Sequence, residues 1–318
     1  MRGRPSPPCA GPRRLASTVL FAVLAAAPWS GRAQQDEPEA PVVLSGSLKT
    51  IHDRGSIRIG YREASVPFSY RSSIGEPAGY SIELCKVLAA DIGDAVSREL
   101  RLQWVPVTSA DRVEAVTSGR IDVECGSTTN NAERRQVVSF SPTFFVAGTK
   151  LMVKRGSGIK SFRDLRGRRI AVTAGTTNEK TMHELGQRFG LGLQFVVSRD
   201  HDASLAALLD GQADAFATDD VLLYGLVAQR QLKADVEVVG DYLSYEPYAV
   251  MYRKDDPMMA RVVNDSFQRM AADGEIERQY RRWFMRRLPF GSSVGGSMDL
   301  PMSAELRAII SATATRAE

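Results

Sequence analysis

The sequence predicts an α/β protein made of two similar units. Strand-like and helix-like patterns alternate twice, first over residues 48–124 and again over 169–217. Such alternation favours parallel strands with helices on both faces. Two extended apolar segments without helix signals, Phe144–Val153 and Ser244–Arg253, run between the units. We therefore expect two lobes, each a mostly parallel sheet flanked by helices, joined by two hinge strands.

In the first unit, alternating apolar residues indicate strands, and apolar residues at helical spacing indicate helices. Gly119 ends the last helix of this unit. The expected elements are helix Leu48–Arg54, strand Ser56–Gly60, helix Ile82–Ile92, strand Leu102–Val107, helix Arg112–Ser118 and strand Ile121–Glu124.

The second unit repeats this pattern, and Gly211 ends its second helix. Its expected elements are strand Arg169–Thr173, helix Lys180–Phe189, strand Leu193–Val197, helix Ser204–Leu209 and strand Ala213–Ala217. One long helix, Met258–Met285, would then rejoin the first lobe, and Ser303–Ile310 reads as a short C-terminal helix.

The N-terminus has the pattern of an export signal. Four arginines precede an apolar run, Leu15–Pro28, and small residues at 31–33 favour cleavage near Ala33. The run is shorter than the roughly 20 residues that a spanning helix needs. We therefore expect an exported protein without stable membrane insertion. The expected division is 1–33 signal peptide, 34–43 disordered lead, 44–146 plus 247–318 lobe 1, and 147–246 lobe 2.

Composition excludes some partners. The formal net charge of +4 includes the basic signal, so the mature chain is closer to neutral, which argues against nucleic acid. Four arginines at 281–287 surround Trp283 and Phe284, which predicts a helix with buried aromatic and solvated basic faces. Cysteine and histidine are too few and scattered for a structural zinc site, and we expect no metal or cofactor.

Two cysteines, Cys85 and Cys125, remain after processing. In an oxidising compartment they could pair. They could equally be buried thiols, one on a helix and one at a strand end. The sequence does not decide between these alternatives.

Polar side chains follow six of the predicted strands. Open α/β sheets bind ligands outside the carboxyl ends of their strands, so these residues should face one cleft. They are Arg62, Ser109, Arg112, Ser127, Thr129, Arg134, Thr176, Thr177, His201 and Asp219.

The densest polar cluster is Glu124–Arg134. Ser127 and Thr129 can donate hydroxyl hydrogen bonds, and Arg134 can grip a carboxylate with two parallel bonds. Asn130 and Glu133 fit an N-cap and its partner, so we expect a short helical turn whose start suits an anion. The alternative is a capped helix with a surface arginine.

Several segments resemble one known family. Residues 60–70 (GYREASVPFSY), 124–134, 162–172 and 252–257 are similar to periplasmic glutamate/aspartate-binding proteins, the solute receptors of polar amino-acid ABC transporters (bacterial solute-binding protein family 3). The resemblance covers about residues 44–310. It implies the two-lobe periplasmic-binding-protein fold (type II). It also implies binding of L-glutamate or L-aspartate in the interlobe cleft and delivery to an inner-membrane ABC permease by a monomer that is not an enzyme.

Two departures from the family stand out. The segment Phe290–Met298 is rich in glycine and serine. A cysteine that the family leads us to expect near Val250 is absent, so Cys125 has no partner there. Neither departure touches the ligand contacts that the resemblance implies.

The resemblance also implies a role for each polar residue. The ligand's α-carboxylate would contact Ser127, Thr129, Arg134 and Thr177, its α-ammonium Asp219, and its side-chain carboxylate Arg62, Ser109, Arg112 and His201. Structural alternatives exist for most of them: Thr177 and Asp219 as helix caps, Arg62 and Arg112 as surface residues, and His201 as a loop histidine.

The charges of these residues favour an acidic ligand. Three arginines and one aspartate complement two carboxylates and one ammonium. Glutamine would leave a buried arginine unpaired, which costs about 3–5 kcal/mol and predicts about hundredfold discrimination or more. One methylene is worth only ~1–3 kcal/mol, so we expect both acids to bind. The sequence does not rank them.

Two other functions are open from sequence. A cyclohexadienyl (prephenate/arogenate) dehydratase-like enzyme uses the same fold and needs a general acid, for which Glu63 or Glu124 would be candidates. We find no acid–base pair, and Ser, His and Asp do not form a hydrolase elbow. A sensory domain that reports ligand to another protein is the third class.

Overall fold

The structure is a computed structural model that describes residues 43–287 and 296–315. The predicted signal peptide and nearly all of the expected lead lie outside this range, as does most of segment 290–298. The first half contains α1 (Gly46–Arg54), β1 (Ser56–Tyr61), β2 (Ala64–Ser65), β3 (Ser69–Arg71), β4 (Pro77–Ala78), α2 (Tyr80–Ala95), β5 (Arg101–Pro106), α3 (Arg112–Thr117), β6 (Val123–Glu124), η1 (Arg134–Gln136), β7 (Val138–Phe140), β8 (Phe145–Ala147) and β9 (Thr149–Lys154).

The second half again alternates strands and helices before the chain returns to the first lobe. It contains η2 (Phe162–Leu165), β10 (Arg169–Thr173), α4 (Thr177–Arg188), β11 (Gln194–Ser198), α5 (His201–Leu209), β12 (Ala215–Asp219), α6 (Asp220–Arg230), β13 (Val236–Val239), β14 (Glu246–Tyr248), β15 (Met251–Arg253), α7 (Pro257–Ala272), α8 (Glu275–Phe284) and α9 (Ala304–Ala314).

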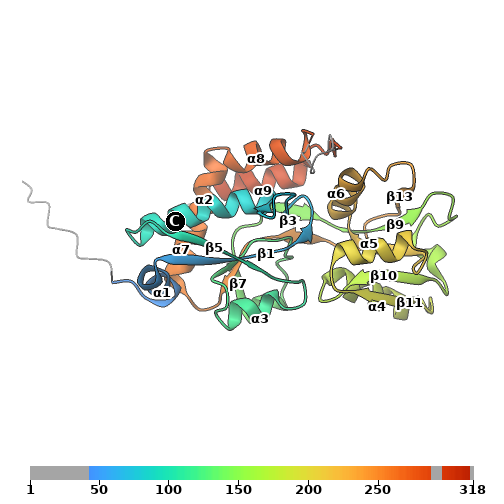
Figure 1. Cartoon of the computed structure of the whole chain (residues 1–318), viewed down its shortest axis with the longest axis horizontal. Coiled ribbons are helices and arrows are strands. Elements are labelled where there is room, and N and C mark those ends of the chain that lie inside the picture. The colour runs from blue at the N-terminus through green and yellow to red at the C-terminus, as the bar shows by residue number, and fades with distance from the viewer. Residues whose placement is uncertain (1–42, 288–295, 316–318) are drawn as a thin grey trace, which may run out of the picture. The chain divides into compact units, whose positions relative to one another are not determined.

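Within the described residues ten of the strands form two five-stranded sheets, one in each lobe (Figure 1), and β2-β3-β4 and β14-β8 form two smaller sheets. The first has the order β5-β1-β6-β15-β7, with β1 parallel to β5 and β6 and with β15 antiparallel to its neighbours. The second has the order β11-β10-β12-β9-β13, with β10 parallel to β11 and β12 and with β9 antiparallel to its neighbours. The predicted two-lobe α/β class is confirmed: each sheet has three parallel strands next to a fourth that is antiparallel to its neighbours.

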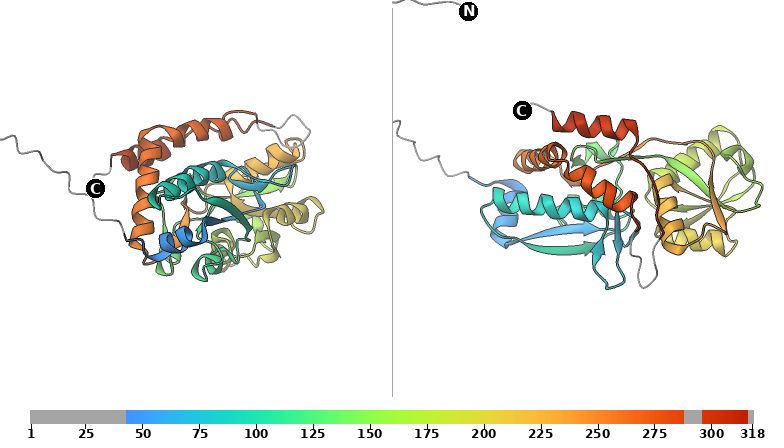
Figure 2. Two further views of the ribbon diagram at one scale, coloured as in Figure 1. Left: turned by 60° about the vertical axis from the view of Figure 1, so that its left-hand side comes forward. Right: turned by 90° about the horizontal axis from the view of Figure 1, so that it is seen from above.

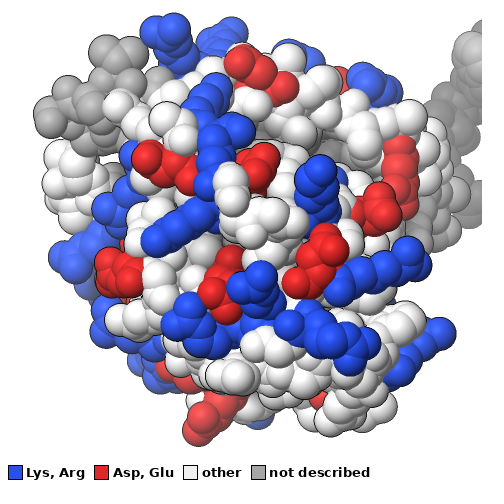
Figure 3. All heavy atoms as spheres, turned by 90° about the vertical axis from the view of Figure 1, so that its right-hand side faces the viewer, with Lys and Arg blue, Asp and Glu red and all other residues white. Residues whose placement is uncertain are grey.

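Helices cover both faces of each sheet. On the first sheet, α2, α7, α8 and α9 share one apolar core with β1, and α3 packs on the opposite face (Figures 1 and 2). On the second sheet, α5 and α6 pack on one face and α4 on the other. The arginines of α8 are exposed while Trp283 and Phe284 are buried, as the sequence predicts. Figure 3 shows lysine and arginine interspersed with aspartate and glutamate on the second-lobe side.

Two segments connect the lobes, as expected, but neither is unbroken. The first is divided into β8 and β9, and the second into β14 and β15. β8 and β14 pair with each other as a two-stranded antiparallel sheet, whereas β9 and β15 each join a lobe. The exact boundaries of the lobes, at residues 146 and 247, stay a prediction.

The predicted helix Met258–Met285 is wrong as a single element. The structure has α7 and α8 separated at Asp273 and Gly274. Gly274 adopts a φ of 69°, in the left-handed region that favours glycine, and this turns the chain between the helices. The helix expected at Ser303–Ile310 is confirmed as α9, where the Ser303 side chain accepts from the Leu306 N–H.

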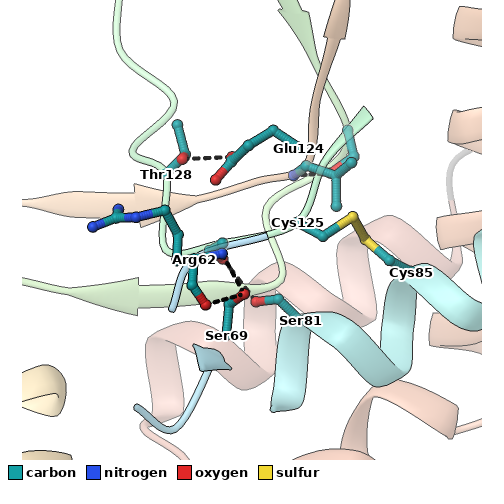
Figure 4. Close-up of a disulfide and its surroundings, with 10 residues drawn as sticks. Arg62, Ser69, Ser81, Cys85, Glu124, Cys125 and Thr128 are labelled. Atoms are coloured by element: carbon teal, nitrogen blue, oxygen red, sulfur yellow. Dashed lines mark hydrogen bonds between the residues drawn. A yellow bond between two sulfur atoms is a disulfide. The ribbon is translucent and has the colours of Figure 1, made fainter. Parts of the chain in front are cut away.

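The open question about the cysteines is resolved by a disulfide. Cys85 of α2 and Cys125, which follows β6, are bonded, with their Cα atoms 6.3 Å apart (Figure 4). The bond ties the helix layer of the first lobe to the start of the predicted binding loop. Among the described helices, none is long and apolar enough to cross a membrane.

Candidate ligand-binding site

Two of the predicted arginines are buried, which contradicts the surface alternative. Arg62 follows β1 and Arg112 begins α3, and each is only 2% exposed. Burial lowers the pKa of Arg62 to about 9, and the nearby charge of Arg112 acts in the same direction. Burial also lowers the pKa of Arg112, against the charge of Glu124. Burying two cations side by side is costly unless an anion meets them.

A hydrogen-bonded relay organises the loop after β6. Arg112 Nη1 donates to Thr128 Oγ1 at 2.7 Å, and Thr128 Oγ1 donates to Glu124 Oε2 at 2.6 Å. Glu124 is fully buried, and Figure 4 shows its carboxylate directed at Thr128. A Cβ at Gly126 would lie 2.3 Å from Glu124 Oε1 and 2.8 Å from Arg62 Cγ, so only glycine fits there. Thr128 was not predicted from the sequence, although it lies in the run of hydroxyl residues Ser127–Thr129.

Several buried polar atoms at the expected side-chain end have no hydrogen-bond partner among the described residues. They are Arg62 Nη1, Ser109 Oγ, Arg112 Nε and Glu124 Oε1. A buried polar atom left unpaired costs about 1–3 kcal/mol, and more when it is charged. Two cationic N–H groups and a hydroxyl are suited to receive an anion. This cluster is therefore the strongest mark of a ligand site.

The segment around Arg134 departs from its predicted form. Arg134–Gln136 is a single 3-10 turn, in which the Asn131 side chain accepts from the Arg134 N–H at 2.9 Å. The predicted cap of Asn130 with Glu133 is wrong, because the Glu133 carboxylate pairs instead with Lys180 at 2.6 Å. So short a turn offers no helix-start anion site.

Arg134 is half-buried and links the two lobes. Its Nη1 donates to the Thr129 carbonyl oxygen at 2.9 Å, and its Nη2 donates to the Gly175 carbonyl oxygen at 3.4 Å. Burial lowers its pKa to about 9, with Arg112 adding to this effect. Its remaining N–H groups are the ones able to meet a carboxylate.

Thr129 and Thr177 meet on a carboxylate that the sequence analysis missed. Both hydroxyls donate to Glu246 Oε2, at 2.6 and 2.7 Å, and Ser244 Oγ donates to Oε1 at 2.6 Å. Thr177 is not the cap of α4, because Thr176 fills that position and accepts from the Glu179 N–H. The missed signal was an acidic residue inside an extended apolar segment.

Asp219 takes the cap position of α6 by backbone only. Its carboxylate makes no cap bond and instead accepts from Asn178 Nδ2 at 2.7 Å and from the Tyr248 hydroxyl. Burial, and then the charge of Glu246, raise the pKa of Asp219 to about 7. A cation placed against this carboxylate would relieve both effects. Asn178 and Tyr248 were not predicted from the sequence.

His201 begins α5 and is buried, so the loop alternative is wrong. Its Nδ1 lies 2.8 Å from Thr173 Oγ1, which also lies 2.9 Å from Ser204 Oγ. Burial, and then the charges of Arg62 and Arg112, lower the pKa of His201 well below its ordinary value. His201 of the second lobe therefore favours its neutral form close to the two arginines of the first lobe.

The charge count made from sequence is incomplete. Glu124, Asp219 and Glu246 are all buried, and the charges of all three act on Arg112 and Arg134, so the three arginines have three carboxylates nearby. The excess positive charge inferred from sequence is therefore not present in the site as a whole. What favours an anion is local: the unpartnered N–H groups at one end. No group of three or more His, Cys, Asp or Glu that could hold a metal occurs in the part of the chain that the structure describes.

The two lobes and the buried polar cluster between their strand ends define a solute-binding protein of the two-lobe class. The family model for bacterial extracellular solute-binding proteins, family 3, matches residues 57–286, and the chain belongs to that family. The family membership predicted from short motifs is confirmed.

Individual relatives are similar over nearly the whole chain. An L-glutamate/L-aspartate-binding protein of Pseudomonas aeruginosa is 37% identical, covering 96% of this chain and 98% of the relative. A glutamate/aspartate import solute-binding protein of Escherichia coli is 35% identical, covering 91% and 94%. A solved structure of an ancestral arginine-binding protein bound to arginine has a TM-score of 0.67 at 29% identity, covering 73% of this chain and 99% of that one. All three are named as binding proteins, and the second as one of an import system. The chain is accordingly a solute receptor and not an enzyme, and the dehydratase alternative is not favoured.

Proposed function

We propose that this protein is a periplasmic receptor for L-glutamate and L-aspartate that hands its ligand to an inner-membrane ABC permease. The observation that carries the proposal is the set of buried donors, on Arg62, Ser109 and Arg112, that have no partner among the described residues. Two relatives, each matched over more than 90% of its length, are named for the same two amino acids.

The roles follow from the chemistry of each end. Arg62, Ser109 and Arg112 receive the side-chain carboxylate, with neutral His201 beside them. Arg134, Ser127, Thr129 and Thr177 receive the α-carboxylate, and Asp219 receives the α-ammonium. A second ligand carboxylate is needed to satisfy the unpartnered arginine N–H groups, and a neutral amide would leave them without an anion.

Closure of the lobes would complete the site. The first lobe supplies Arg62, Arg112 and Arg134, and the second supplies Thr177, His201 and Asp219. Contacts already span the lobes, such as Arg134 Nη2 to the Gly175 oxygen and Thr129 Oγ1 to Thr177 Oγ1 at 3.4 Å. Closing buries the ligand charges and gives the permease a distinct shape to recognise.

The proposal includes the cellular setting. A basic and then apolar N-terminus cleaved near Ala33 exports the chain to the periplasm, where it works as a monomer. The disulfide between Cys85 and Cys125 is consistent with an oxidising compartment.

Calorimetric titration tests the proposal directly. Protein stripped of ligand is titrated with L-glutamate, L-aspartate, L-glutamine and L-histidine. We expect tight binding of the two acids and at least about hundredfold weaker binding of glutamine. Equal or tighter binding of a neutral or basic amino acid would overturn the side-chain pocket. Binding of none of them, with turnover of prephenate or arogenate, would favour the enzyme.

A further inference from the structure

The hinge segment carries a buried carboxylate where the two lobes meet. Glu246, on β14, is 2% exposed. Its Oε2 accepts hydroxyl hydrogen bonds from Thr129 of the first lobe and Thr177 of the second, and its Oε1 accepts from Ser244 of the hinge. One carboxylate thus accepts hydrogen bonds from both lobes and from the segment between them.

The position of Glu246 is fixed by a chain of hydrogen bonds with a defined direction. Asn178 Nδ2 donates to Thr149 Oγ1 at 2.7 Å, and Thr149 Oγ1 lies 2.7 Å from Ser244 Oγ. Ser244 Oγ gives its single proton to Glu246, so Thr149 must give its own to Ser244. The same Asn178 amide also holds Asp219, so Glu246 belongs to one network with the proposed ammonium partner.

A hydroxyl carries one proton and cannot donate it twice. Thr129 and Thr177 therefore cannot donate to Glu246 and to a ligand carboxylate at the same time. Two of the four groups proposed to bind the α-carboxylate are in use, whereas the donors on Arg62, Ser109 and Arg112 at the other end have no partner among the described residues.

We propose that Glu246 limits ligand affinity: its carboxylate competes with the α-carboxylate of the bound amino acid for the hydroxyls of Thr129 and Thr177, and releases them when the ligand binds. The inference rests on the proposed function and deepens it. It gives an affinity-setting role to a residue that makes no direct contact with the ligand in that proposal.

The sign of the effect of a substitution separates this role from its opposite. If the contact exists only without ligand, weakening it destabilises the free protein and not the complex, so affinity rises. If Glu246 were a permanent clasp, weakening it would destabilise the closed complex, and affinity would fall.

The test compares Glu246→Gln with wild type by calorimetric titration at neutral pH. Glutamine keeps the shape and the acceptor oxygen but loses the charge that strengthens the hydroxyl bonds. We expect about tenfold tighter binding of both L-glutamate and L-aspartate, since the α-carboxylate is common to them. Unchanged or weaker binding would overturn the inference.

Two further variants provide a second test and a control. Ser244→Ala removes one hydrogen bond from Glu246 without altering it, and should tighten binding by about two- to threefold, which also decides the matter if Glu246→Gln fails to fold. Glu133→Gln is the matched control, because Glu133 also bridges the lobes, through Lys180, but is exposed and lies outside the site. It should give no tightening, and thermal unfolding of each variant reports its fold.

Failure of the proposed function gives a different result. Wild type that binds neither acid overturns the receptor proposal by itself. Small-angle scattering of the ligand-free proteins then tests the bridge without any ligand. Glu246→Gln should be more expanded than wild type, because the bonds that join Thr129 and Thr177 are weakened. Equal radii of gyration would show that Glu246 does not hold the lobes together, and the inference would fail.

Discussion

The two ends of the candidate site use their hydrogen-bond donors in opposite ways. At the side-chain end, Arg62, Ser109 and Arg112 each keep a buried donor without a partner among the described residues. At the α-carboxylate end, Thr129 and Thr177 donate to Glu246. In the proposed binding mode, a ligand would meet donors without a partner at one end and donors already in hydrogen bonds at the other. The proposed function and the inference about Glu246 together predict that different residues control selectivity for a second carboxylate and overall affinity.

The difference has a simple physical origin. At the side-chain end the charge of Glu124 acts on both arginines, but its Oε2 accepts from Thr128 and neither arginine donates to this carboxylate directly. The hydroxyls at the other end face a hinge strand, which brings its own carboxylate to them. Unpaired buried donors lower the stability of the folded protein, and we expect bound ligand to recover this cost at the proposed side-chain end.

The largest expected effect comes from removing a donor at the side-chain end. Arg112→Ala should weaken binding of L-glutamate by at least about a hundredfold, because the ligand carboxylate loses a buried partner and Thr128 loses its donor. Calorimetry measures the loss. Arg120→Ala is the control, since Arg120 forms an exposed pair with Asp111 and should bind as wild type does. An equal loss of affinity in Arg112→Ala and Arg120→Ala would contradict the proposal that Arg112 binds the ligand's side-chain carboxylate.

The disulfide next to the site should matter for stability. Replacing both Cys85 and Cys125 by alanine opens a loop closed over 40 residues, and we expect about 4 kcal/mol less free energy of unfolding in the chain-entropy model. Urea unfolding with and without reductant measures it. Because Cys125 adjoins the loop that serves both ends, binding should weaken for both acids together. Unchanged binding beside a loss of unfolding free energy would show that the bond stabilises the fold without positioning the loop.

The pH dependence of binding should report the ammonium partner. The pKa of Asp219 is raised to about 7, and an ammonium favours the deprotonated carboxylate. Affinity should therefore be nearly constant from pH 7 to 8 and fall about tenfold for each unit below pH 7, as a proton must leave on binding. His201, whose pKa is well below its ordinary value, stays neutral there. Titrations from pH 5.5 to 8 measure the slope, and a flat profile would exclude Asp219 from this role.

The same group makes a prediction for stability. The pKa of Asp219 is higher in the folded chain than the ordinary 3.8, so the folded state binds more protons between these values. Its contribution to the free energy of unfolding is therefore greatest below about pH 4 and declines as pH rises towards 7. Asp219→Asn, compared with wild type by thermal unfolding across this range, should lose that decline.

The smallest effect is expected outside both ends. Lys180→Ala breaks the exposed pair with Glu133 that spans the lobes. Because solvent and salt screen such a pair, affinity should change by less than about threefold, and the change should vanish at high salt. A larger loss would mean that closure depends on the rim of the cleft as well as on its interior.

The sequence by itself determined the fold class, the family and the positions of the polar residues at strand ends. Local patterns carry this information: apolar periodicity set β10 and α2 to within a few residues, and motifs such as residues 60–70 carry the family. Where local signals compete, prediction failed. Helix periodicity ran through Asp273 and Gly274, although the glycine turns the chain there.

Only the tertiary structure decided which groups are partners. Glu246 is 117 residues from Thr129 and 69 from Thr177, and no local pattern in the sequence predicts contacts over such separations. The pairing of Cys85 with Cys125, the relay through Thr128 and the burial of Glu124 likewise depend on packing between distant segments. Charge can be counted along a chain, but whether a buried charge is free or already satisfied depends on atoms that only folding brings within hydrogen-bond distance.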